Sequence, residues 1–126
     1  MQVTRVHNDE RGSITSLTGL TQCPEIVFVK TNKGYARGGC VHETDETVLV
    51  IEGSIILTCD FSTPKRINQQ WLQMDAGDPS MIVPANVPHY FQALEDCLVM
   101  EYGPDNEYTQ KDSRMRNTVE KINQEA

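Results

Sequence analysis

Short runs of alternating apolar and polar residues, separated by turn residues, extend along most of this chain. Alternation with a period of two is typical of β-strands that bury one face. The pattern predicts strands over five ranges, 25–31, 47–52, 54–59, 80–83 and 97–102. About ten short strands of this kind would fit the whole pattern, which indicates an all-β sandwich or small barrel.

Turn residues mark the ends of these strands. Glu52 and Gly53 lie between two runs rich in Val, Ile and Leu. They predict a tight hairpin, because glycine readily adopts the positive φ that such turns need. Residues 61–68 contain Pro64 and several charged residues, and they predict a second hairpin loop. A long helix is excluded after this loop, because helix breakers follow at short intervals: Gly77, Pro79, Pro84 and Pro88.

The end of the chain has a different pattern. Residues 111–126 are mostly polar, but Met115, Val119 and Ile122 recur at the i, i+4, i+7 spacing of an amphipathic helix. Such a helix either packs against the barrel or binds a partner. We therefore expect a barrel domain over residues 1–110 and a polar C-terminal helix or tail over residues 111–126.

Composition narrows the classes of function. The 126 residues include 18 Asp and Glu against 11 Lys and Arg, a formal net charge of -7, which argues against binding to nucleic acid or anionic lipid. No apolar run approaches the roughly 20 residues that cross a bilayer, and the first residues lack a signal-peptide pattern. We expect a cytoplasmic protein with no membrane partner. The four cysteines are scattered, which favours reduced thiols.

Potential metal ligands and proton carriers concentrate in two segments. Cys40 and His42 are two residues apart, so on a strand they share a face, and Glu46 can rejoin them after a turn. His89 begins a predicted strand farther along. Thiolate, imidazole and carboxylate groups together suit borderline metals such as Zn²⁺ or Fe²⁺. An imidazole also accepts and returns protons near neutrality, which makes His42 a candidate base.

The first segment resembles motif one of the cupin superfamily, GX5HXHX3-4EX6G. Gly34, His42, Glu46 and Gly53 match it at every spacing, and Cys40 replaces the first histidine. The resemblance implies a single jelly-roll barrel.

The second segment resembles motif two of the same superfamily, GX5PXGXXHX3N, more loosely. Pro84 and His89 match, Gly77 lies one residue early, and Ala93 replaces the final Asn. Asn86 replaces a glycine, a mild change because Asn tolerates a left-handed backbone.

Metal-dependent cupins hold a divalent ion at these motif positions. The resemblance therefore implies Zn, Fe, Mn or Ni bound by His42, Glu46, His89 and Cys40. The alternative for Cys40 is a small apolar strand residue, as buried free cysteines often are. That alternative leaves a site of three ligands or no metal site.

Two further segments resemble one group of cupins, the WxcM-like sugar 3,4-ketoisomerases. Residues 37–42, Arg-Gly-Gly-Cys-Val-His, resemble their RGxHxH segment. Residues 9–14, Asp-Glu-Arg-Gly-Ser-Ile, resemble the D-x-RGxL segment of these proteins and of related 3,5-epimerases. The resemblance implies an isomerase or epimerase that removes a proton next to the ketone of a nucleotide-linked 4-keto-6-deoxy sugar.

The same resemblance implies roles for individual residues. His42, Cys40 and His89 would be catalytic, while Arg37, Arg11 and Tyr35 would bind the nucleotide sugar. Arginine suits a diphosphate through its bidentate fork. The alternative for Arg37 is a salt bridge or backbone contact at the barrel mouth, and for Tyr35 it is a core or dimer contact.

Three functions remain open at this point. The first is the sugar-nucleotide isomerase or epimerase, and the second is a metal-dependent cupin such as a small dioxygenase. The third is a non-catalytic cupin that binds a ligand. Fold alone does not choose among them, because one barrel hosts many functions. Small cupins commonly exchange N-terminal strands, so we also expect a homodimer.

Overall fold

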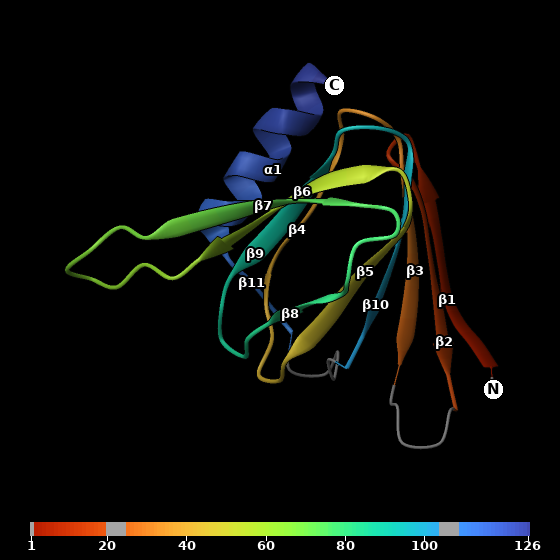
Figure 1. Ribbon diagram of the computed structural model, residues 1–126, viewed down its shortest axis with the longest axis horizontal. Helices are drawn as coiled ribbons and strands as arrows, with labels where there is room; N and C mark the ends of the chain where they lie inside the picture. The colour runs from red at the N-terminus through yellow and green to blue at the C-terminus, as the bar shows by residue number, and fades with distance from the viewer. Residues whose placement is uncertain (1, 20–24, 104–108) are drawn as a thin grey trace.

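The computed structural model describes residues 2–19, 25–103 and 109–126, without the side chains of residues 4–6. The described residues form two antiparallel sheets and one helix (Figure 1). The first sheet has the strand order β1-β2-β3-β10-β5-β8, and the second has the order β11-β4-β9-β6-β7. The bounds are β1 Gln2–Asp9, β2 Gly12–Thr18, β3 Ile26–Thr31, β4 Ala36–Val41, β5 Glu46–Glu52, β6 Ser54–Asp60, β7 Gln69–Asp75, β8 Met81–Val83, β9 His89–Ala93, β10 Cys97–Tyr102, β11 Gln110–Lys111 and α1 Ser113–Glu125.

The strands agree with those predicted from the alternating pattern. All five predicted ranges are confirmed, and each boundary lies within one residue of the observed one. The hairpin loop between β6 and β7 is also confirmed, since these strands pair and the Phe61 amide donates to the Asn68 carbonyl at 2.8 Å. The fold is the all-β jelly-roll barrel that the sequence predicts.

The tight hairpin predicted at Glu52 and Gly53 is wrong. β5 and β6 do not pair, because β5 lies in the first sheet and β6 in the second. Gly53 instead forms the corner between the sheets, with φ of +80°, and a Cβ at this position would collide with the carbonyl oxygen of Asp96. Each strand pairs elsewhere, β5 with β10 and β8 and β6 with β7 and β9, so their buried faces meet across the core from opposite sheets.

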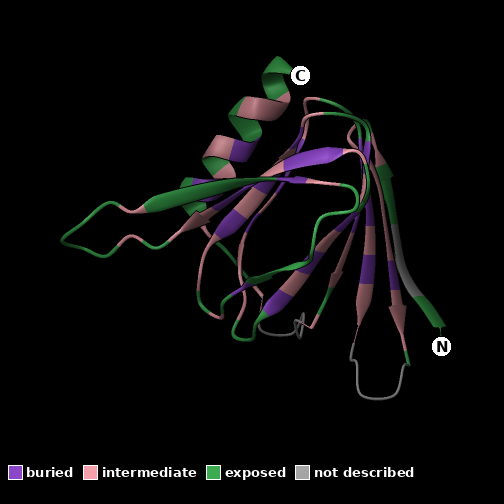
Figure 2. Cartoon of the chain, viewed as in Figure 1, coloured by how far each residue is buried: buried purple, intermediate pink, exposed green. Residues whose placement is uncertain are grey.

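The core fills the space between the sheets, where buried residues alternate along the strands (Figure 2). On β9, the buried residues are His89, Phe91 and Ala93. On β5, they are Glu46, Val48 and Val50. The first residues of these two strands, Glu46 and His89, are therefore polar, yet they lie on the same strand face as the apolar core residues. They face each other from opposite sheets.

Helix α1 packs against β4. It begins after Asp112, whose carboxylate accepts the Met115 amide at 3.0 Å. Met115 and Val119 are buried, as the helical spacing predicts. The Asn123 side chain bonds both the amide and the carbonyl of Ala36, at 2.7 and 3.1 Å. Among the helices that the structure describes, none is long and apolar enough to cross a membrane.

A bulge in β4 determines which side chains face the interior. Arg37 lies opposite Phe91 and Cys40 lies opposite His89, with a register shift between them. Residues opposite each other share a face, so the extra residue places Arg37 and Cys40 on the same face although they are three apart. Two glycines permit this, with φ of +106° at Gly38 and +81° at Gly39.

The bulge also brings α1 close to the backbone of β4. A Cβ on Gly39 would lie 2.7 Å from Cδ and 3.0 Å from the amide nitrogen of Arg116. We expect Gly39→Ala to lower the free energy of unfolding by about 2 kcal/mol or more, measured by urea denaturation. Gly77→Ala is the matched control, because Gly77 also has positive φ, +93°, but nothing lies within 4 Å. Equal losses in the two variants would contradict the steric explanation.

Candidate metal centre

Three side chains predicted as ligands meet between the two sheets. Potential ligand atoms of His42, Glu46 and His89 all lie within 4.8 Å of one another. Glu46 is the first residue of β5 and His89 the first residue of β9, while His42 follows the end of β4. The two strand starts lie in opposite sheets, so the fold itself brings together residues 43 positions apart.

The buried carboxylate of Glu46 is the centre of this group. Its Oε2 lies 2.7 Å from Nε2 of His42 and 3.5 Å from Nε2 of His89, and the two imidazole centroids are 5.2 Å apart. Only 2% of the Glu46 side chain is exposed. A buried carboxylate requires a positive partner to offset its lost hydration, either an imidazolium or a metal ion.

Each imidazole has a second partner that holds its orientation. Nδ1 of His89 donates to the Val87 carbonyl at 3.0 Å, so Nε2 of the neutral ring presents a lone pair toward Glu46. Nδ1 of His42 lies 2.7 Å from the hydroxyl of Thr109. Contacts of this type fix the tautomer of metal-binding histidines. No pattern in the sequence points to Thr109, which is 67 residues from His42.

The charges in this group stabilise one another. Burial raises the pKa of Glu46, but hydrogen bonds from His42 and His89 outweigh burial, and the net pKa is lowered. Burial lowers the pKa of His89, but the bond to Glu46 and the charge of Glu46 outweigh it, and the net pKa is raised. Both shifts favour the ion pair in the metal-free protein.

Cys40 lines the same cavity but is not one of the three clustered ligands. Burial raises the pKa of its thiol, which favours the protonated form over the thiolate that binds metal. The structure therefore brings together three of the four predicted ligands and places the fourth beside them. Asn86, the replacement for a motif glycine, has the expected left-handed backbone, with φ of +64°.

The group lies in a cavity of about 250 Å³ that also contains three arginines. Arg11 and Arg37 were predicted to bind substrate, and both line the cavity. Arg116 of α1 also lines it, and its Nη1 donates to the Gly38 carbonyl at 2.8 Å. The sequence analysis did not single out Arg116, because it lies in a polar segment outside the motifs. Tyr35 does not line the cavity, and its backbone bonds Asn32 and Ala93.

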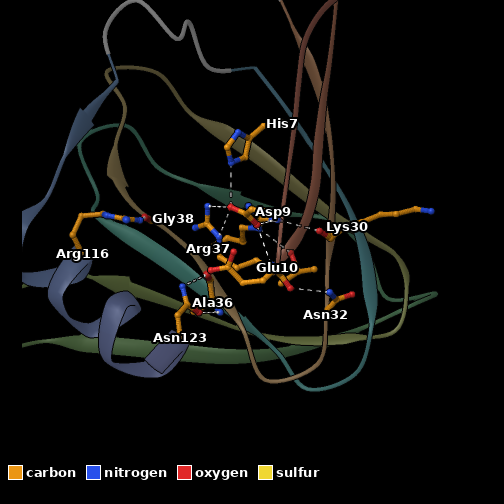
Figure 3. Close-up of polar contacts among 12 residues, drawn as sticks. His7, Asp9, Glu10, Lys30, Asn32, Ala36, Arg37, Gly38, Arg116 and Asn123 are labelled. Atoms are coloured by element: carbon orange, nitrogen blue, oxygen red, sulfur yellow. Dashed lines mark hydrogen bonds and ion pairs between the residues drawn. The ribbon is translucent and has the colours of Figure 1, made fainter. Parts of the chain in front are cut away.

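The two arginines predicted to bind substrate share the carboxylate of Asp9. Figure 3 shows Asp9 beside Arg37. Nε and Nη2 of Arg11 donate to Asp9 at 3.0 and 2.7 Å, and Nη2 of Arg37 lies 3.8 Å from Asp9. The Arg11 bonds hold the pKa of Asp9 well below its usual range. The salt bridge considered for Arg37 is therefore present, as a long contact, and one carboxylate faces two guanidinium groups.

Comparisons with known proteins show the fold. No protein-family model and no curated protein matches the chain. The structure of CapF with the inhibitor 3-isopropenyl-tropolone matches 86% of the chain, with a TM-score of 0.73 and 16% identity. The structure of the capsular polysaccharide assembling protein CapF from Staphylococcus aureus also matches 86%, with a TM-score of 0.67 and 19% identity. Oxalate decarboxylase from Bacillus subtilis covers 86% at a TM-score of 0.70 and 19% identity.

These matches define the class of fold as the cupin barrel. The chain spans 33%, 32% and 30% of the length of these three structures. The likeness thus covers about a third of each larger protein, and the fold agrees with the cupin fold that the two motifs predict.

Proposed function

We propose that this protein is a metal-dependent cupin enzyme that holds one divalent ion through His42, Glu46 and His89. The observation that carries the proposal is the convergence of these ligand atoms within 4.8 Å in the wall of a cavity. The hydrogen bond from His89 to Val87 supports it, because it engages Nδ1 and leaves Nε2, once deprotonated, as the ring atom that faces the Glu46 carboxylate and can bind a metal. A cation between these atoms would satisfy both groups.

The ligand set restricts the metal. Two imidazoles and one carboxylate suit Zn, Fe, Mn or Ni, and a set of three leaves positions open for water or substrate, as in catalytic sites. When bound, such an ion polarises a substrate oxygen or lowers the pKa of a bound water. The chain itself orients the two imidazoles through Val87 and Thr109.

A second candidate is an isomerase or epimerase that acts on a nucleotide-linked 4-keto-6-deoxy sugar. The observation that favours it is that the two segments resembling the sugar isomerases meet in space, since Asp9 contacts both Arg11 and Arg37. The likeness to CapF, a capsular polysaccharide assembling protein, is in line with sugar chemistry. His42 would serve as the base in this reaction.

One experiment separates the two functions. Elemental analysis of the purified protein should find about one divalent ion per chain, and chelation should lower the melting temperature, with Zn²⁺ restoring it. The same thermal-shift assay with dTDP and UDP sugars tests the second function. Stabilisation by nucleotide sugars with no bound metal would overturn the first proposal in favour of the second.

A further inference from the structure

The outer face of the six-stranded sheet is apolar, although polar residues are usual on the outward side of a sandwich. Along β3, buried residues that face the core alternate with Ile26 and Phe28, which are half-buried and face outward. Strand pairing continues this outward face across the sheet, and its apolar members, the apolar face, are Leu17, Ile26, Phe28, Leu49, Ile82, Leu98, Met100 and Tyr102. A contiguous apolar surface of this kind marks an interaction site.

The described part of the chain leaves this face open to solvent. Helix α1 packs against β4 and β9, which both belong to the second sheet, and Figure 1 shows it on that side of the barrel. On the apolar face, 61% of Ile82 is exposed on the edge strand β8, and 39% of Tyr102 is exposed at the end of β10. Removal of such side chains from water is favourable, so a partner on this face would be stabilised.

Strand β10 lies at the centre of the apolar face, between β3 and β5. Met100 of β10 lies opposite Phe28 on one side and opposite Leu49 on the other. A two-fold axis that runs along β10 between two copies would place β3 of each copy over β5 of the other. Phe28 would then pack against the partner's Leu49, and the two Met100 side chains would meet near the axis. Such an interface is self-complementary, as a two-fold dimer requires.

The charged residues beside the apolar face fit the same axis. Leu98 lies opposite Lys30 of β3 and Glu52 of β5, so a cation and an anion flank β10. Both charged side chains are exposed, and Figure 3 shows Lys30 directed away from the residues around Arg37. The axis along β10 would pair each Lys30 with the partner's Glu52, twice in a dimer. An axis across the strands would instead place Lys30 over the partner's Ile26, where a charge without a partner is costly.

We propose that a second copy of this chain packs on the apolar face, with the two six-stranded sheets face to face. The strands of this sheet cover a plane of roughly 600 Å², at about 4.8 Å between strands and about 3.3 Å per residue. Side chains that stand out of the plane enlarge its accessible surface toward the roughly 800 Å² per partner that specific interfaces bury. The net charge of -7 disfavours anionic lipid as the occupant. This pairing needs no exchange of N-terminal strands and no bound metal.

Sedimentation equilibrium of the purified protein tests this pairing. The wild type should form a dimer with a dissociation constant in the micromolar range or below. Lys30→Glu should weaken the dimer by about tenfold or more, because the new carboxylate would face the partner's Glu52. Glu52→Lys should weaken it to a similar extent, and the double variant should restore the wild-type affinity, because each pair is then reversed. Trp71→Ser is the matched control and should dimerise like the wild type, since Trp71 is 72% exposed but lies on β7 of the second sheet.

Met100→Glu tests the centre of the apolar face. It would bring two carboxylates together near the axis and should weaken the dimer by about 100-fold or more, with circular dichroism as the check that the variant is folded. If it does not fold, the charge reversals at Lys30 and Glu52 still decide, because both side chains are exposed. Failure of the double variant to restore affinity would overturn the axis along β10. A monomeric wild type, a dimer that the charge reversals leave unchanged, or a monomer that binds phosphatidylcholine vesicles would overturn the proposal.

Discussion

His89→Ala should lower the Zn²⁺ affinity of the metal-free protein by more than about 100-fold. Loss of a partner that orients a ligand costs about 10–100-fold, and loss of the ligand itself should cost more. Thr109→Val gives the intermediate case, since it removes only the hydroxyl 2.7 Å from Nδ1 of His42. We expect a loss of about tenfold there. Calorimetric titration of chelator-treated protein with Zn²⁺ measures both.

The chain contains a matched control for this experiment. His7 is the remaining histidine, and it lies on β1, where it is exposed and contacts Asp9 at 3.1 Å rather than the ligand group. His7→Ala should leave Zn²⁺ affinity and the stoichiometry of one ion unchanged. Equal affinity in His89→Ala and His7→Ala would show that the buried group is not the site of binding.

The stability of the metal-free protein should depend on pH through Glu46 and His89. Folding lowers the pKa of Glu46. Its contribution to the free energy of unfolding is therefore present above the unfolded pKa of about 4.3 and is lost as pH falls through the folded pKa. The pKa of His89 is raised, so its contribution is fully present below about 6.5 and is lost as pH rises through the folded value. Both contributions are present between about pH 4.3 and 6.5.

Glu46→Gln should remove both contributions. Within this range of pH the variant should lose about 3 kcal/mol of unfolding free energy, because removal of one partner leaves the buried His89 imidazolium without a counter-charge. The difference from the wild type should shrink above the folded pKa of His89. Urea denaturation with chelator present, from pH 4 to 8, measures this difference. Glu43→Gln is the control, since Glu43 is exposed in the turn before Glu46. A difference between wild type and Glu46→Gln that does not change with pH would contradict the assignment.

Local pattern was sufficient to predict most of the secondary structure. Alternation along β5 and β10 and the helical spacing of Met115 and Val119 each reflect burial of one face, which a periodic sequence records directly. The motif spacing also identified His42, Glu46 and His89 before their positions were known. The strand and helix predictions are confirmed, because these periods depend on neighbouring residues.

The sheet to which each strand belongs was decided by the tertiary structure. Gly53 has the positive φ that the sequence predicts, but this conformation serves a corner between sheets as well as a hairpin. Local sequence does not distinguish these two uses, because the choice depends on which distant strands offer a partner. β5 pairs with β10 and β8, and β6 pairs with β7 and β9.

The sequence by itself thus predicted the strands and the C-terminal helix from local spacing, and its resemblance to the cupin motifs named the three side chains that cluster as candidate metal ligands. The three-dimensional fold decided which of the side chains near the two motifs in sequence line the same cavity. The bulge at Gly39 places Arg37 and Cys40 on one face, and a single extra residue reverses every face assignment beyond it. Thr109 and Arg116 reach the site only through long-range packing, which no local pattern encodes.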